Sequence, residues 1–358
     1  MKQAEESVKY IMKTSYRKEI AMINHSYKAY VVEEGEDGSF SGGIRDKTIN
    51  ELPPGDITVR VEYSSLNYKD ALSATGNRAV TKTYPHTPGI DAAGIVEESN
   101  AQNLPEGTPV IVTSYDLGMN TPGGFGQYIR VPADWVVPLP PGLSLIESMI
   151  FGTAGFTAGL SVLKLTASVK PEQGPIVVTG ATGGVGSVAV AVLSKLGYTV
   201  SGVSGKPNAK DFLGPLGVDK IIGREAFLEN TDRPLLKPLW AGAVDTVGGD
   251  PLATAIKSTH PLGVVTCCGN AASPQLPITV FPFILRGVSL MGVNSQGCPM
   301  NIRKTVWEKL SHDWKFSGLE RICQEISLQE LSDRIETILK GRSLGRTVVR
   351  LDRTSVAA

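Results

Sequence analysis

Short segments with alternating apolar and polar side chains fill the chain from residue 26 to residue 135. Clusters of glycine and proline separate these segments, a pattern typical of strands joined by tight turns. The segments read KAYVVEE, ITVRVEY, AAGIVEE, TPVIVTS and GQYIRVP. The pattern predicts a compact all-β unit with a barrel-like arrangement.

The periodicity changes after Pro138. The segment LSLIESMIFGTAGFTAGLSVLKL has helical periodicity, and PIVVTGATGGVGSVAVAVLSKLGYTVSGVSG reads as a strand, a glycine-rich turn, a helix and a second strand that ends at Val203. Strands that alternate with helices predict a parallel sheet with covering helices. Beyond residue 300 the chain returns to charged amphipathic helices and a last strand, GRTVVRL.

These patterns predict two domains, because 358 residues exceed what one hydrophobic core usually serves. We expect a β-rich domain from residues 22–149 and 297–358. A doubly wound α/β domain of the Rossmann type is expected over residues 150–296. Residues 1–21 carry alternating charges without the apolar core of a signal peptide, so we interpret them as an N-terminal extension that precedes the fold.

Composition excludes several classes of protein. With 35 basic and 35 acidic residues, the chain lacks the basic excess of a nucleic-acid binder. The apolar run 176–193 contains four glycines, which favours a buried strand, turn and helix over a membrane span. The cysteines show no metal-ligand or disulfide spacing, which favours a reducing, cytoplasmic location; they are Cys267, Cys268, Cys298 and Cys323.

The segment VVTGATGGVG, residues 177–186, predicts a dinucleotide site. Glycines between a buried strand and an apolar helix allow a tight turn and a close approach of the backbone to a pyrophosphate, while the helix N-terminus supplies amide donors. The predicted cofactor contacts in this turn are Thr182, Gly183, Gly184 and Val185.

The end of the second strand predicts NADPH rather than NADH. NAD enzymes commonly place an acidic residue there, whereas this chain has Ser204, Gly205 and Lys206. A hydroxyl, a free amide and an ammonium bind a 2′-phosphate that a carboxylate would repel. Arg224, at the end of the next predicted strand, is a further candidate for the same phosphate or the adenine, although a solvated loop charge is the alternative interpretation.

Taken together, the ordered strings SSLNYKDALSATG, PGIDAAG, GTAGFTA, VTGATGGVGSVAV, WAGAVDTVGG and PFILRGVSLMGVNS resemble the medium-chain dehydrogenase/reductase superfamily over residues 26–352. Within it they look like the YhdH-type subgroup of NADPH-dependent acrylyl-CoA reductases and quinone oxidoreductases. The resemblance implies a GroES-like catalytic domain, a Rossmann domain and a cofactor, NADPH.

The resemblance also implies a metal-free site. Zinc-dependent relatives carry a Cys at the position of Asn67, a His at that of Ile90 and a second Cys at about that of Ala154. The four-cysteine structural zinc lobe is missing as well, because the first Cys is residue 267. Metal-free members reduce activated double bonds or quinones, so the expected reaction is reduction of acrylyl-CoA or a similar enoyl thioester.

The segment SSLNYKD, residues 64–70, is the expected wall of the active site. By resemblance, Tyr68 lies against the cofactor and Asn67 near the substrate. Asp70 is expected to orient the backbone and Lys69 to face solvent. The alternative is an ordinary helix start capped by Ser64 or Ser65, with Tyr68 packed as a half-buried aromatic.

Chain order adds candidate cofactor contacts at the ends of two later strands; they are Cys268, Gly269, Asn294 and Ser295. Core packing is the alternative for Cys268, which we do not expect to be a nucleophile. The proton donor stays open, because Asn77 and Arg78 stand where related enoyl reductases have a tyrosine, and Tyr84 lies several residues later. Solvent is one source of the proton.

Basic residues near the predicted cleft are candidates for the phosphates of CoA; they are Arg78, Lys82, Arg286 and Arg303. A broad quinone or enone reductase is the alternative enzyme, and a non-catalytic NADPH-binding protein is the alternative of another class. The predicted edge strand GVSLMGVNS suggests a homodimer.

Overall fold

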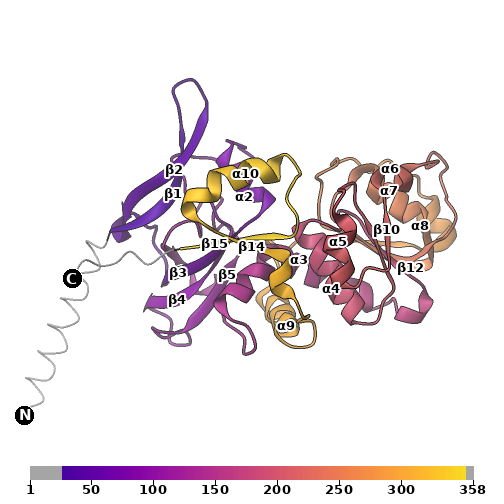
Figure 1. Cartoon of the computed structure of the whole chain (residues 1–358). Helices are drawn as coiled ribbons and strands as arrows, with labels where there is room; N and C mark the ends of the chain where they lie inside the picture. The colour runs from indigo at the N-terminus through magenta and orange to yellow at the C-terminus, as the bar shows by residue number, and fades with distance from the viewer. Residues whose placement is uncertain (1–25, 352–358) are drawn as a thin grey trace, which may run out of the picture.

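A computed structural model describes residues 26–351, and the predicted extension at residues 1–21 lies outside them. Figure 1 shows two lobes joined near the middle of the molecule, with the C-terminal segment returning to the lobe formed by the first strands. Each lobe contains its own main β-sheet.

The first lobe contains a seven-stranded sheet with the order β14-β15-β3-β4-β5-β7, in which β6 also pairs with β3. The strands are β3 (Ile57–Leu66), β4 (Asp91–Ser99), β5 (Pro109–Thr113), β6 (Tyr128–Val131), β7 (Val136–Pro138), β14 (Cys323–Ser327) and β15 (Arg346–Arg350). A separate antiparallel pair is formed by β1 (Ser26–Glu34) and β2 (Phe40–Thr48). Helices α2 (Tyr68–Ala74) and α10 (Leu331–Leu339) pack together beside these sheets.

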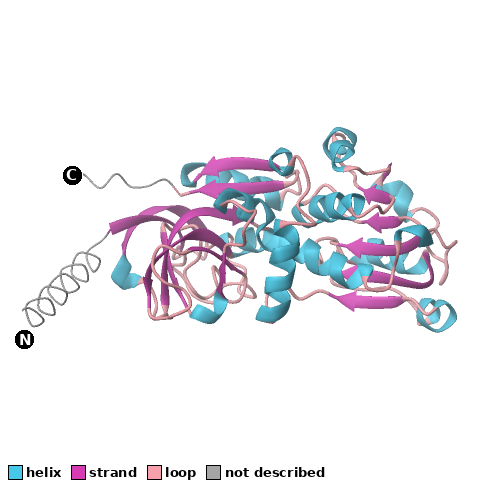
Figure 2. Cartoon of the chain, turned by 90° about the horizontal axis from the view of Figure 1, so that it is seen from below, coloured by secondary structure: helices cyan, strands magenta, loops and turns pink. Residues whose placement is uncertain are grey.

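The second lobe contains a six-stranded parallel sheet with the order β10-β9-β8-β11-β12-β13. Its strands are β8 (Ile176–Val178), β9 (Val200–Val203), β10 (Lys220–Ile222), β11 (Trp240–Asp245), β12 (Thr259–Cys267) and β13 (Ser289–Gly292). The accompanying helices are α4 (Gly184–Lys195), α5 (Ala209–Leu213), α6 (Arg224–Leu228), α7 (Gly249–Lys257) and α8 (Phe281–Arg286). Figure 2 shows these strands running side by side.

Helix α3 (Leu145–Thr166) connects the lobes. Its N-cap is Ser144, whose hydroxyl accepts the N–H of Glu147. The helix packs against α4 and α9 (Met300–Ser311) and against β4 of the first lobe. The helix is long and apolar enough to cross a membrane, but 78% of its most apolar window is buried inside the protein. It is therefore a core helix, and burial on several sides explains why its middle part carries apolar residues on more than one face.

A glycine interrupts α3 near its start. Gly152 has φ 50° and ψ −158°, a conformation that residues with a side chain rarely adopt. A Cβ atom at this position would lie 2.5 Å from the Asp91 carboxylate and 2.5 Å from the Ser65 hydroxyl. The kink therefore brings the backbone of α3 against the polar centre of the first lobe, and helical periodicity alone did not predict it.

Six short 3-10 helices complete the described secondary structure; they are Ile49–Glu51, Ala133–Trp135, Pro171–Gln173, Gly214–Leu216, Leu319–Ile322 and Leu328–Glu330. The predicted fold class, a GroES-like β-rich unit with a Rossmann-type parallel sheet, is confirmed. The pairing of β15 with β3 also confirms the predicted return of the C-terminal segment. The domain boundaries near residues 149 and 297 stay predictions.

Candidate active site

The glycine-rich turn links β8 to α4, as the sequence predicts. Gly183 is the N-cap of α4, so Gly184 and Val185 lie in the first turn of this helix. A Cβ atom at Gly186 would lie 2.3 Å from the carbonyl oxygen of Gly180. The turn therefore requires glycine for its own packing, and it exposes helix N-terminal amides of the kind that bind pyrophosphate.

A group of polar and basic side chains surrounds the end of β9. The hydroxyls of Ser204 and Thr182 lie 3.0 Å apart, and the Lys206 N–H donates to the Ser204 hydroxyl at 3.2 Å. Arg224 begins α6 close by, and a Cβ atom on Gly205 would lie 3.6 Å from its guanidinium carbon. These predicted cofactor residues therefore converge on one position.

Electrostatics at this group favour an anion. Burial lowers the pKa of Lys206, and the nearby Arg224 guanidinium lowers that pKa further. The Lys206 ammonium donates to the carbonyl oxygen of Ser343, which belongs to the segment that leads into β15. Because the two cations repel each other, a phosphate between them would relieve the repulsion.

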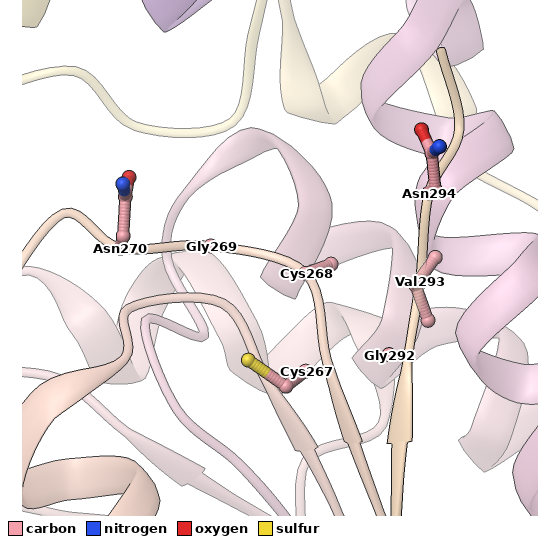
Figure 3. Close-up of a pocket in the computed structure, with 7 residues that line it drawn as sticks. All are labelled: Cys267, Cys268, Gly269, Asn270, Gly292, Val293 and Asn294. Atoms are coloured by element: carbon pink, nitrogen blue, oxygen red, sulfur yellow. The ribbon is translucent and has the colours of Figure 1, made fainter. Parts of the chain in front are cut away.

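A pocket lies at the carboxyl ends of β12 and β13, where ligands bind to open α/β sheets. Figure 3 shows its lining, with the amides of Asn270 and Asn294 rising from the loops on either side. Of the predicted contacts, Cys268, Gly269 and Asn294 line the pocket, whereas Ser295 does not. The sequence reasoning missed four lining residues, Cys267, Asn270, Gly292 and Val293.

The two neighbouring thiols are held in protonated form. Burial, and secondarily the Asp245 carboxylate, raises the pKa of Cys268 to about 12, and the same two causes raise the pKa of Cys267. The Cys268 thiol donates to the carbonyl oxygen of Asp245 at 3.3 Å. Because the thiolate is the reactive form of cysteine, this geometry agrees with the expectation that Cys268 is not a nucleophile.

Asn67 begins helix α2 and connects three buried groups. Its backbone N–H donates to Asp70 at 2.7 Å, its side-chain amide donates to Asp91 at 2.8 Å, and its amide oxygen accepts from Arg346 at 3.1 Å. The alternative in which Ser64 or Ser65 caps the helix is wrong. Both serine hydroxyls instead donate to Asp91, at 2.6 Å to its carbonyl and 2.5 Å to its carboxylate.

Sequence reasoning missed the polar centre itself, which consists of Asp91, Thr153 and Arg346. The Thr153 hydroxyl donates to the Asp91 carboxylate at 2.6 Å, and Arg346 lies 3.9 Å from the same carboxylate. Arg346 also donates to the carbonyl of Ile150 at 2.9 Å, and a Cβ atom on Gly184 would lie 2.9 Å from its guanidinium. One buried arginine thus connects the first lobe to the glycine-rich turn. The available signal was weak: Asp91 is the one charge in the apolar string PGIDAAG, and Arg346 is one of two arginines in GRTVVRL.

Tyr68 and Lys69 occupy the first turn of α2. The Tyr68 side chain is 45% exposed. The Lys69 ammonium is half-buried and donates to the side-chain oxygen of Gln296 at 2.8 Å. Burial lowers the pKa of Lys69, and Asp70 opposes this change. The prediction that Lys69 faces solvent is therefore wrong.

Asp70 has the orienting role expected of it. Its carboxylate accepts the N–H groups of Gly89 at 3.2 Å and Ile90 at 2.8 Å, in addition to that of Asn67. Burial and the Asp91 charge raise the pKa of Asp70 to about 7, while the N–H donors oppose the rise.

Two of the four basic residues that were expected to bind the phosphates of CoA are engaged within the protein instead. Arg303 is fully buried and donates to Thr113 and to the carbonyl of Ser295, and Arg286 donates to three backbone carbonyls. Arg78 is exposed and forms an ion pair with Glu34, and Lys82 is exposed.

The residues do not fit a catalytic zinc site. The Asn67 amide is occupied by Asp91 and Arg346, and Ile90 and Ala154 offer no ligand atom. Within residues 26–351, no group of three or more His, Cys, Asp or Glu side chains is placed to hold a metal ion. A buried guanidinium beside Asn67 also disfavours a second cation there.

Two family models match the chain. The alcohol dehydrogenase GroES-like domain matches residues 53–141, and the zinc-binding dehydrogenase domain matches residues 184–312. Among curated proteins, YhfP of Bacillus subtilis, which carries a quinone oxidoreductase name, is 44% identical over 322 residues and covers 89% of this chain and 98% of its own. The acrylyl-CoA reductase AcuI of Ruegeria pomeroyi is 42% identical and covers 90% of this chain and 98% of its own.

Solved structures agree with these matches. The YhdH oxidoreductase of Salmonella enterica, in complex with NADP, has a TM-score of 0.88 at 43% identity and covers 91% of this chain and all of its own. A structure of B. subtilis YhfP with NAD bound has a TM-score of 0.89 at 43% identity, with 92% and 100% coverage.

Proposed function

Because this chain belongs to the medium-chain dehydrogenase/reductase superfamily, in the subgroup of YhdH, YhfP and AcuI, we propose that it is an NADPH-dependent reductase of activated carbon–carbon double bonds. The leading substrate is acrylyl-CoA, which is reduced to propionyl-CoA. One observation carries the reaction class: the position of a zinc ligand is held by an asparagine fixed between a carboxylate and a guanidinium. Such a site suits an acceptor that is already electrophilic and needs no Lewis acid.

The cofactor fits the residues present. The turn at Thr182, Gly183, Gly184 and Val185 would hold the pyrophosphate, and Ser204, Gly205, Lys206 and Arg224 would hold the 2′-phosphate and adenosine end. Cys268, Gly269 and Asn294, which line the pocket, would contact the nicotinamide, which supplies a hydride when bound. Tyr68 and Ser295 stay proposed cofactor contacts outside this lining. Both NADP and NAD occur in the solved relatives, and the cationic group near Ser204 supports NADPH for this chain.

The protein's own contribution is position and polarity. The Asn67 side-chain amide donates to Ser65, Asp70 and Asp91 and accepts from Arg346, so it presents a rigid polar wall rather than a mobile side chain. Because both N–H groups of this amide already donate to protein oxygens, Asn67 contributes a fixed position and shape rather than a free donor to the substrate. Asn67 and Tyr68 remain the proposed contacts to substrate and cofactor, respectively.

Reduction of quinones or enones is a second candidate, supported by the name of the relative YhfP. A screen of NADPH oxidation with acrylyl-CoA, crotonyl-CoA and a quinone in parallel separates the two. The proposal requires the highest kcat/KM for acrylyl-CoA and propionyl-CoA as the product. A kcat/KM for the quinone that exceeds both thioesters would reject it in favour of the second candidate.

A second copy of this chain is the proposed partner. Strand β13 ends the parallel sheet, and the adjoining helix α8 presents Ile284 and Leu285 with 66% and 63% of their surface exposed. Leu262, at the start of β12, is 79% exposed. An edge strand bordered by apolar side chains suits extension of the sheet across a two-fold axis. The free thiols suit a reducing, cytoplasmic compartment.

A further inference from the structure

Lys69 is a half-buried cation that links α2 to the loop between β13 and α9 at the candidate active site. Its ammonium lies on α2, two residues after Asn67, and donates to Gln296, two residues after the pocket residue Asn294. The Gln296 backbone N–H donates to Asn294 at 3.1 Å. The ammonium therefore lies between the wall expected for the substrate and the pocket expected for the nicotinamide.

Gln296 itself is held firmly. Its carbonyl oxygen accepts from the Tyr115 N–H at 3.3 Å and from the buried Arg303 guanidinium at 3.4 Å. Arg303 lies 4.5 Å from the centre of the Tyr115 ring. Tyr115 and its neighbour Ser114 both have positive φ, 52° and 65°, which non-glycine residues hold only where the surroundings enforce it. The backbone that carries the acceptor of Lys69 is thus held in place.

The contact with Gln296 does not use all the hydrogen-bond donors of the Lys69 ammonium. An ammonium has three donors, and the neutral amide oxygen of Gln296 occupies one of them. The charged groups around Lys69 are the Asp70 carboxylate on its own helical turn and, behind Gln296, the Arg303 guanidinium. Asp70 is already engaged with backbone N–H groups.

The Tyr84 hydroxyl, the other candidate proton donor, is bound elsewhere. The Tyr84 hydroxyl donates to the carbonyl oxygen of Ser73 at 2.5 Å, on the opposite end of α2 from Lys69. Its ring packs against Phe40, with ring centres 4.8 Å apart. Lys69 is therefore the better placed of the two acids.

From this geometry we propose that Lys69 is the general acid of the reduction, an inference that rests on the proposed function. The hydride adds to the β-carbon of the enoyl thioester, and the electron pair of the double bond forms an enolate. The α-carbon of the enolate then takes a proton from the Lys69 ammonium. The neutral amine regains a proton from water, so the sum is one hydride and one proton added to the substrate.

The direct test compares Lys69→Met with Lys69→Arg and with a matched control, Lys304→Met, which alters an exposed lysine on α9. We expect Lys69→Met to lower kcat by about 100-fold or more, the usual contribution of a general acid, with KM for NADPH unchanged. Lys304→Met should behave as wild type. Lys69→Arg should be almost as slow as Lys69→Met, because a guanidinium does not readily release its proton.

A second measurement identifies the group that delivers the proton to the α-carbon. In D2O the wild type should give propionyl-CoA with one configuration at the α-deuterated carbon, whereas Lys69→Met should give a mixture because solvent then protonates both faces. Retained configuration in Lys69→Met, together with a raised KM for NADPH, would show that Lys69 only links α2 to the loop between β13 and α9 and would overturn the proposal. Failure of the wild type to reduce any enoyl thioester would instead reject the proposed function.

Gln296→Glu provides a test that does not depend on turnover. A carboxylate beside the ammonium favours its charged form, so this change should raise the pKa of Lys69. NMR of 13C-dimethylated lysines in the ligand-free protein measures this pKa, with Lys69→Arg assigning the signal. The basic limb of the kcat/KM–pH profile, which reports the pKa values of the free enzyme, should move upward by the same amount. A shifted pKa with an unmoved basic limb would contradict the role of Lys69 as acid.

Discussion

At the scale of single residues, the choice of cofactor depends on the basic group beside Ser204. Lys206→Glu places a negative charge where the 2′-phosphate is expected. We predict that KM for NADPH rises by about 10- to 100-fold, the range of one charged hydrogen bond, while KM for NADH changes little. Steady-state kinetics with both cofactors measure this effect, with Lys304→Glu as the control. Equal increases in KM for NADPH and NADH would show that Lys206 does not contact the 2′-phosphate.

The raised pKa of Asp70 predicts that the free energy of unfolding depends on pH. Its pKa is raised from 3.8 to about 7 in the folded protein, so the folded state binds the proton more tightly than the unfolded state. The stabilisation is complete below about pH 4 and is lost as the pH rises to 7, with a slope of at most about 1.4 kcal/mol per pH unit. Urea unfolding between pH 5 and 8 should show this fall in the wild type but not in Asp70→Asn. If the free energy of unfolding changes with pH in the same way in both proteins, Asp70 is not the source of the pH dependence.

At the scale of elements, we expect the interruption of helix α3 at Gly152 to tolerate substitution poorly. Gly152→Ala puts a Cβ atom 2.5 Å from both the Asp91 carboxylate and the Ser65 hydroxyl, at a φ of 50°. We predict a loss of about 1–3 kcal/mol or more in the free energy of unfolding, with reduced activity, because the polar centre must shift. Gly214→Ala is the control, since a Cβ there meets no atom within 4 Å. Equal stability of the two variants in denaturant titrations would contradict this account.

Sequence reasoning succeeded for elements whose chemistry is local. The glycine-rich turn, the strand that ends at Val203 and the basic residues after it follow from short spacings, and the structure places them together. It failed for contacts between distant segments. Ser65 and Arg346 lie 281 positions apart, and Lys69 and Gln296 lie 227 positions apart, so no periodicity relates them. The kink at Gly152 escaped prediction for the same reason, because its cause lies in Asp91 on β4.

At the scale of the whole molecule, the exposed apolar side chains of α8 predict the oligomeric state. Ile284→Asp should convert a dimer into a monomer, because a carboxylate cannot be buried unpaired at an interface. Ile302→Asp, on α9, which lies apart from α8 in Figure 1, should leave the assembly unchanged. Sedimentation velocity distinguishes the two outcomes. A wild-type protein that sediments as a monomer would exclude the proposed partner.

The two lobes also explain why one buried arginine matters to the whole chain. Arg346 starts β15 of the first lobe, yet its guanidinium reaches Asn67, the kink of α3 and the glycine-rich turn of the second lobe. A change in the relative position of the lobes would therefore disturb the substrate wall and the cofactor turn together. The hydrogen bond between Lys69 and Gln296 also joins α2 to the loop that follows β13.

The central claim, that this protein transfers a hydride from NADPH to an enoyl thioester without a metal, is tested most directly by isotope transfer. Chelator-treated enzyme is given acrylyl-CoA and NADPH deuterated separately on each face of the nicotinamide C4, and the propionyl-CoA is analysed by NMR. The account predicts one deuterium at the β-carbon from one face only, at the same rate before and after chelation. Absence of deuterium from the product, or loss of the reaction on chelation with recovery on addition of zinc, would contradict it.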